Sequence, residues 1–233
     1  MSPPCFCVSP PCPAPPQAEA WLQEEAQRQG WSRAVTLRDR RAREGLVGLL
    51  REGTNAVLVE LNCETDFVAK TAEFQRGLTL SPLLPPGKLG EKLALRRAAW
   101  LRVPRASGFI GVYSHGGLAA PPAPVAMGTY GALVACEVTE PRAPEATLED
   151  VGRKVAQHVV GLAPREVGTP QDELGGEEES RLLAQGFLLE PELSVGQFLR
   201  RRGVLSVTDF LRFRCGEETH GEPHGGEGTR VDS

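Results

Sequence analysis

Along residues 56–61, apolar side chains at every second position, 57, 59 and 61, alternate with a second set at 56, 58 and 60, which includes the charged Glu60. This period of two is typical of a β-strand with one buried face. The residues EGTN at 52–55 are typical of a turn, and another β-prone run precedes them. The pattern therefore predicts a β-hairpin over residues 40–63.

A helical period replaces this alternation in residues 147–164, TLEDVGRKVAQHVVGLAP. Thr147 can cap the helix through its hydroxyl, and two acidic residues follow in the first turn. Pro164 ends the pattern. The side chains predicted to face the core lie three or four positions apart: Leu148, Val151, Val155, Val159 and Leu162.

Shorter elements are predicted on either side of these two. Apolar spacing and capping residues predict further helices over residues 17–29, 67–77, 172–185 and 194–203. The acidic composition of 172–185 predicts that this helix is exposed. β-Prone runs with Gly- and Pro-rich connections, which suit an antiparallel sheet, predict strands over residues 91–104, 108–117, 129–140 and 204–217.

The order of these elements predicts an α+β fold made of two small units, each an antiparallel sheet carrying helices. Pro82, Pro85 and Pro86 exclude a continuous helix over residues 77–90, so we place the boundary between the units there. The expected divisions are a Pro- and Cys-rich leader, a first unit, a second unit and a Gly-rich tail, at 1–17, 35–87, 88–217 and 218–233.

Composition narrows the class of protein. The 233 residues are 40% hydrophobic and 24% charged, which is typical of a globular chain. A net charge of −4 disfavours direct nucleic-acid binding. The sequence contains no run of about 18 apolar residues of the kind that predicts a membrane span. The leader has the features of neither a secretory signal nor a mitochondrial transit peptide.

Candidate catalytic chemistry is sparse. The phosphate-loop, nucleophile-elbow, zinc-protease and dinucleotide-binding motifs are all missing from the sequence. The six cysteines form no paired C-x-x-C motifs, which disfavours a zinc site and suits the reduced thiols of an intracellular protein. A thiol enzyme using Cys63, with His115 as its base, stays an alternative. His158 lies beside the apolar stripe of its helix, where a packing role is typical.

The junction between the predicted hairpin and the next helix places an acid directly before a large apolar residue. In NCETDFVAK, Thr65 can cap the helix, and Asp66 lies in its first turn. Phe67 and Phe74 are seven residues apart, so a shared helix face would bury both in a core. A probe aimed at another protein explains the Asp66–Phe67 pair equally well, and the residue pattern leaves both interpretations open.

The stretch VLVELNCETDFVAKTAEFQ, residues 57–75, closely resembles the signature of elongation factor Ts, in its mitochondrial type. Its T-D-F-V core is highly specific. The helix over 18–34 resembles the end of that family's N-terminal helical domain. Other family-like pieces follow in the family's order: REGLVGLLREG, GEKLALRRAAW, GVYSHGG, YGALVACE, VAQHVVGLAP and VTDFLRFRCGE.

The resemblance implies a guanine-nucleotide exchange factor of mitochondrial translation, acting in the matrix without a cofactor or catalytic chemistry of its own. Its partner would be elongation factor Tu, bound in the GDP state. Phe67 would wedge between partner side chains, and Asp66 would disturb the Mg²⁺ environment. The residues expected to contact the partner are Thr65, Asp66, Phe67, Val68, His115 and His158.

The chain also departs from the family pattern. The family has a longer segment between the T-D-F-V helix and the GEKLALRRAAW strand, and here residues 77–90 bridge that gap. Most of the family's N-terminal helical domain has no counterpart. A binding-only or inert variant of the family is therefore an alternative to an active exchange factor.

Overall fold

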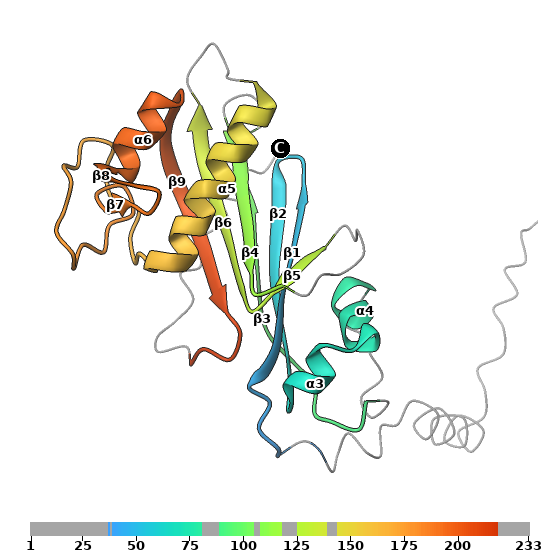
Figure 1. Cartoon of the computed structure of the whole chain (residues 1–233). Coiled ribbons are helices and arrows are strands. Elements are labelled where there is room, and N and C mark those ends of the chain that lie inside the picture. The colour runs from blue at the N-terminus through green and yellow to red at the C-terminus, as the bar shows by residue number, and fades with distance from the viewer. Residues whose placement is uncertain are drawn as a thin grey trace, which may run out of the picture.

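The computed structural model describes Leu37 and residues 39–80, 89–104, 108–117, 125–138 and 144–218. The expected leader, the helix over 17–29 and nearly all of the expected tail lie outside these residues. Within them the chain folds into antiparallel sheets with a small number of helices (Figure 1). The predicted α+β class is therefore confirmed.

The first sheet has the strand order β3-β2-β1-β5. The predicted hairpin is confirmed, since β1 and β2 pair in register around the turn between Glu52 and Asn55. A short strand that the sequence did not predict, β5, pairs with the other side of β1. The strands are β1 (Glu44–Glu52), β2 (Asn55–Cys63), β3 (Ala94–Arg102) and β5 (Ala126–Gly128).

Strand β3 corrects the predicted division of strands between the sheets. The sequence pattern places it with the strands that follow, but β3 pairs antiparallel with β2, for example Trp100 with Val57. β5 also comes from beyond the expected boundary near residue 87. That boundary therefore does not separate the two sheets, because the first sheet recruits strands from both sides of it.

The second sheet has the order β4-β6-β9, with β4 (Gly108–His115), β6 (Tyr130–Val138) and β9 (Val204–Arg214). Helix α5 (Glu145–Leu162) lies across this sheet (Figure 1). The N-cap residue is Pro144 rather than Thr147 and makes no side-chain cap hydrogen bond, so the predicted Thr147 cap is wrong. Its predicted stripe is buried except for Leu162, which is 43% exposed in the last turn.

Helix α6 (Val195–Arg201) confirms the predicted helix after residue 194 and has a capping box formed by Ser194 and Gln197. The predicted helix over 172–185 is wrong, because this segment forms turns followed by a hairpin of β7 (Gly186–Phe187) and β8 (Glu190–Ser194). Leu182 and Leu183 instead lie inside the core, and their backbone N–H groups donate to the carbonyls of residues 166 and 167.

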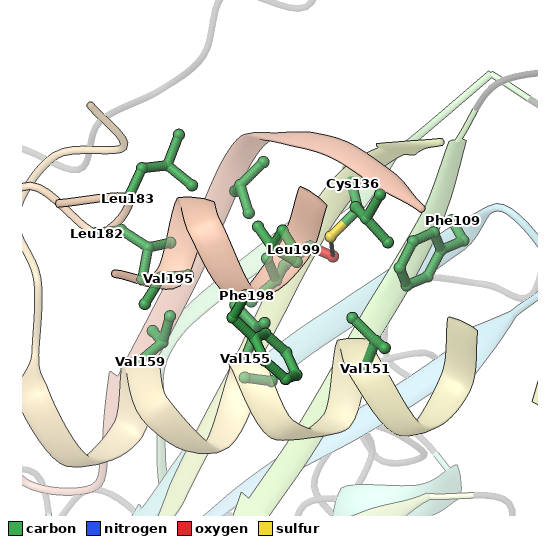
Figure 2. Close-up of a cluster of buried hydrophobic side chains, with 14 of the residues drawn as sticks. Phe109, Cys136, Val151, Val155, Val159, Leu182, Leu183, Val195, Phe198 and Leu199 are labelled. Carbon is green, nitrogen blue, oxygen red and sulfur yellow. Dashed lines mark hydrogen bonds between the residues drawn. The ribbon is translucent and has the colours of Figure 1, made fainter. Parts of the chain in front are cut away.

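The core has three parts. The largest cluster of buried side chains lies between the second sheet and helices α5 and α6 (Figure 2). Within it Phe187 and Phe198 stack with ring centroids 4.1 Å apart. A second cluster lies between the two sheets and includes Leu58 and Leu133. A small third cluster packs short helices against one end of the first sheet, around Cys63 and Phe74.

A buried ion pair between β2 and β3 of the first sheet also contacts the end of β9, which belongs to the second sheet. Glu60 lies on the buried face of β2, and its carboxylate accepts from Arg97 Nε at 2.6 Å and from the Gly216 N–H at 2.8 Å. The Arg97 guanidinium also lies 4.1 Å from the centre of the Phe213 ring. A buried charge is tolerated only when it is paired and hydrogen-bonded, so this contact requires β2, β3 and the end of β9 to be assembled together.

No helix within the described residues is both long enough and apolar enough to span a membrane.

Candidate functional site

The T-D-F-V motif, Thr65–Val68, lies where β2 ends and a short helix begins. Helix α3 (Asp66–Ala69) starts at Thr65, whose side-chain oxygen accepts from the Val68 N–H at 3.4 Å, as the sequence predicted. The predicted single helix over 67–77 is interrupted, because α4 (Ala72–Leu80) begins only after Thr71. The Thr71 hydroxyl donates to the Val68 carbonyl and accepts from the Phe74 N–H, so it closes one helix and opens the next.

This break places the two phenylalanines in opposite environments. Phe74 is fully buried in the third core cluster, whereas Phe67 is 79% exposed. The expectation that both share one helix face is wrong, since α3 and α4 are separate helices. The core interpretation of Phe67 is therefore excluded, and its side chain lies on the surface of the molecule.

The opposite side of α3 is anchored. Ala69 is buried, and Val68 packs partly buried against the cluster that contains Cys63 and Phe74. The motif thus divides into an outward pair, Asp66 and Phe67, and an inward pair, Val68 and Ala69. Because the backbone of α3 is already ordered, a partner that covers the exposed ring does not also have to order the backbone.

Asp66 carries a charge beside the exposed ring. Lys70 Nζ donates to its Oδ2 at 2.6 Å, and this hydrogen bond holds the pKa of Asp66 below its ordinary value. Asp66 is therefore ionised at neutral pH, so the surface presents an acid directly next to an aromatic side chain. Lys70 is not among the residues predicted from the sequence, although its i, i+4 spacing from Asp66 is typical of such a pair.

Cys63 does not fit a nucleophile. The thiol is fully buried and donates to the Thr65 carbonyl at 3.1 Å. Burial, reinforced by the nearby acid Glu91, raises its pKa to about 12. A reactive cysteine needs an accessible thiolate at neutral pH, so the thiol-enzyme alternative is contradicted. Cys63 instead belongs to the packing that supports α3.

His115 is exposed at the end of β4, where its Nδ1 lies 3.2 Å from the Tyr113 hydroxyl. The backbone of His115 lies against Gly128, which pairs with Val47 on β1. Along β1, Val47 is three residues from Glu44, and Glu44 pairs with Cys63, just ahead of α3. Three residues of strand span about 10 Å. His115 therefore lies near the end of the molecule that carries α3.

His158 has a different environment from the one that a partner contact requires. It is fully buried, and its Nε2 lies 3.0 Å from Gln185 Oε1 while Nδ1 accepts from the Leu188 N–H at 3.1 Å. Both ring nitrogens are therefore used inside the fold. The sequence-based packing interpretation agrees with this position, and the expected partner contact is corrected because the ring has no exposed surface.

Comparison with known proteins finds named relatives of this chain. No family model matches the chain. The human protein named "Elongation factor Ts, mitochondrial" is 43% identical over 247 positions, which cover 86% of this chain and 74% of the human protein. The mouse protein of that name is 44% identical, covering 87% and 75%. The Nematostella vectensis protein is 32% identical, covering 85% of this chain and 88% of its own length.

The α+β fold therefore carries an acid–aromatic pair on a surface helix whose other face is anchored. The chain belongs to the elongation factor Ts family, and the relatives that it matches are the mitochondrial form of this translation elongation factor. The comparison with the human protein extends over 247 positions, more than the 233 residues of this chain. The relative therefore contains internal residues without a counterpart here, as expected for a shortened form.

Proposed function

We propose that this chain is a guanine-nucleotide exchange factor that binds elongation factor Tu carrying GDP and promotes GDP release in the mitochondrial matrix. The observation that carries the proposal is the environment of Phe67, which is 79% exposed on a helix whose other face is buried. Such an exposed aromatic side chain, held by an anchored backbone, is suited to enter a partner's surface.

Phe67 supplies part of the free energy of exchange. Burying a Phe side chain is worth about 1.5–3 kcal/mol, and each tenfold change in an equilibrium or rate corresponds to about 1.4 kcal/mol. Insertion of Phe67 between partner side chains therefore accounts for roughly one to two decades of acceleration. The remaining effect comes from the rest of the interface and from the charge of Asp66.

Asp66 acts on the nucleotide site through its charge. Translational GTPases hold the diphosphate with backbone N–H groups, a lysine and Mg²⁺. A carboxylate brought close to this site competes for the cation and its ligands, which leaves the phosphate charge uncompensated. Lys70 lies 2.6 Å from Asp66 in the free chain, so binding must reorganise this ion pair before the carboxylate can act on the partner.

The chain must bind nucleotide-free elongation factor Tu more tightly than the GDP-bound form, because only a difference in affinity shifts an equilibrium. It forms no covalent intermediate and carries out no reaction of its own in this scheme. His115, exposed near the α3 end, is a candidate for a second contact with the partner.

Stopped-flow fluorescence tests the proposal directly. Mitochondrial elongation factor Tu is loaded with a fluorescent GDP analogue, and release into excess unlabelled GDP is followed with increasing concentrations of the chain. We expect release to accelerate and to reach a plateau, and Asp66→Asn, which keeps the size of the side chain, to lower the plateau. A folded chain that neither binds the partner nor accelerates release contradicts the proposal.

A binding-only role is the second candidate, and the comparison with the human relative favours it, since 247 aligned positions exceed the 233 residues of the chain. Residues missing from within the family's fold could remove exchange and keep recognition. Size-exclusion chromatography of the mixture separates the two roles. Co-elution of a stable complex without faster GDP release identifies the binding-only variant.

A further inference from the structure

Glu91, just ahead of β3, contacts the start of the T-D-F-V motif directly. The Thr65 hydroxyl donates to Glu91 Oε1 at 2.5 Å. The backbone N–H groups of Glu64 and Thr65 both donate to Glu91 Oε2, at 3.1 and 3.0 Å. One carboxylate therefore accepts three hydrogen bonds at the point where β2 ends and α3 begins.

These bonds set the orientation of the cap. The Thr65 hydroxyl has one proton, and donating it to Glu91 turns an oxygen lone pair toward the Val68 N–H, which donates to it at 3.4 Å. The direction of the hydrogen bond between Thr65 and Glu91 is fixed, because the hydroxyl donates and a carboxylate oxygen accepts. Glu91 thus fixes the direction of the N-cap bond that starts α3, and with it the direction in which Phe67 leaves the backbone.

A reciprocal contact reinforces this arrangement. Glu64 Oε1 accepts from the Lys92 N–H at 2.8 Å, and Glu64 Oε2 accepts from Arg40 Nη1 at 3.3 Å. Glu91 therefore binds the backbone of residues 64–65, while Glu64 binds the backbone next to Glu91. We call this pair of contacts, between segments more than 25 residues apart, the Glu64–Glu91 clasp.

We propose that Glu91 is a positioning residue for nucleotide exchange, acting through Thr65 to fix the geometry of Asp66 and Phe67. This inference rests on the proposed function. It assigns Glu91 no contact with the partner, because its carboxylate is engaged by the motif itself. Glu91 could not be predicted from the sequence, since its segment lies against the end of β2 only because β3 joins the first sheet.

Two measurements on the full chain test the inference. The first is hydrogen–deuterium exchange by mass spectrometry on peptides that contain residues 64–70, and the second is the stopped-flow release of GDP from the partner. The variants are Glu91→Ala, which removes all three hydrogen bonds, and Glu91→Gln, whose amide oxygen can still accept the two backbone N–H bonds. Glu52→Ala, which removes an exposed acid near the turn of the hairpin, is the charge-matched control.

In Glu91→Ala we expect amide exchange in residues 64–70 to rise about tenfold, since bonds to a charged acceptor stabilise more than neutral ones. The plateau rate of GDP release should fall by about tenfold, with a smaller fall in Glu91→Gln, and thermal unfolding of the rest of the chain should change little. Glu52→Ala should leave both the exchange and the plateau rate unchanged.

The inference is overturned if folded Glu91→Ala releases GDP at the wild-type plateau rate, whatever its amide exchange. It is also overturned if both Glu91 variants lower only the unfolding temperature while exchange in residues 64–70 follows the rest of the chain. A wild-type chain that fails to accelerate release contradicts the proposed function instead. In that case the amide exchange still shows whether Glu91 orders the motif, so the two failures are distinguishable.

Discussion

The two sheets are covered by helices in different ways. On the second sheet, α5 lies in backbone contact with β4, since a Cβ atom at Gly111 would stand 2.5 Å from the backbone of Gly152. On the first sheet, α4 reaches β1 through a side chain, and a Cβ atom at Gly48 would stand 2.9 Å from Leu78 Cγ. Among the described residues, the cluster under α5 contains eighteen buried side chains and the one under α3 and α4 contains four.

The first sheet also leaves apolar surface open. Trp100 and Val57, which pair across β3 and β2, are 66% and 37% exposed, and Leu95 is exposed on the same edge strand. The T-D-F-V motif therefore lies beside the first sheet, whose helices cover few buried side chains, and the largest core cluster lies on the second sheet. The proposed recognition site and the largest core cluster therefore lie in separate regions, so substitutions in the two should have separate effects on GDP release and on stability.

The largest effect is expected where helix and sheet touch through backbone. Gly111→Ala forces α5 away from β4 and should lower the free energy of unfolding by about 3 kcal/mol. Gly48→Ala meets only the movable side chain of Leu78 and should cost less than about 1 kcal/mol. Urea denaturation of both variants measures the difference. Equal losses would show that the two helix covers are packed alike.

The free energy of unfolding is expected to depend on pH through His158, which lies on α5 over the second sheet. Burial lowers the pKa of His158, partly offset by its hydrogen bond to Gln185, so the folded chain holds the ring neutral. Because the unfolded chain binds this proton more readily, stability should be full above the ordinary His pKa of about 6.5 and should fall as pH decreases below it.

Thermal unfolding between pH 7.5 and pH 5 measures this dependence. His158→Gln should flatten the loss of stability on acidification, although it lowers the stability at neutral pH. His115→Gln, the same change at an exposed ring, should keep the wild-type slope. A slope that persists in His158→Gln and disappears in His115→Gln would contradict the assignment.

The smallest effect on folding is expected on the open face. Trp100→Gln should change the free energy of unfolding by no more than about 0.5 kcal/mol, because surface substitutions away from packed sites rarely exceed this. Its Val57 neighbour is also partly exposed and loses little packing. Denaturation of the variant at low protein concentration checks this. A loss comparable to that of Gly111→Ala would mean that the face is covered in solution.

Local patterns predicted the elements whose causes are local. The hairpin around Glu52–Asn55, the Thr65 cap and most of the α5 stripe follow from turn chemistry, capping and periodicity. The partner of β3 could not be predicted in this way, because strand pairing is set by contacts distant in sequence. The segment 172–185 has helical spacing, but burial of Leu182 and Leu183 in the core between α5 and α6 stabilises the fold more than an exposed helix would.

For the candidate site, the sequence supplied residues whose role stays a prediction, and it supplied only part of their geometry. The family resemblance identified Asp66 and Phe67, but their exposure depends on the helix break that the Thr71 hydroxyl creates. A hydroxyl that bonds to the backbone competes with helix continuation, and sequence spacing alone does not decide the outcome. His158 shows the opposite case, where a helix residue beside the apolar stripe turned out to be fully buried.

The central claim is that Phe67 serves recognition and contributes nothing to the fold. The most direct test measures thermal unfolding and GDP release together for Phe67→Ala, with Leu174→Ala as an exposed apolar control outside the α3 end. We predict an unfolding temperature within about 2 °C of wild type for both variants. The plateau rate of release should fall about ten- to a hundredfold for Phe67→Ala alone. A folded Phe67→Ala chain that releases GDP at the wild-type rate would contradict the account.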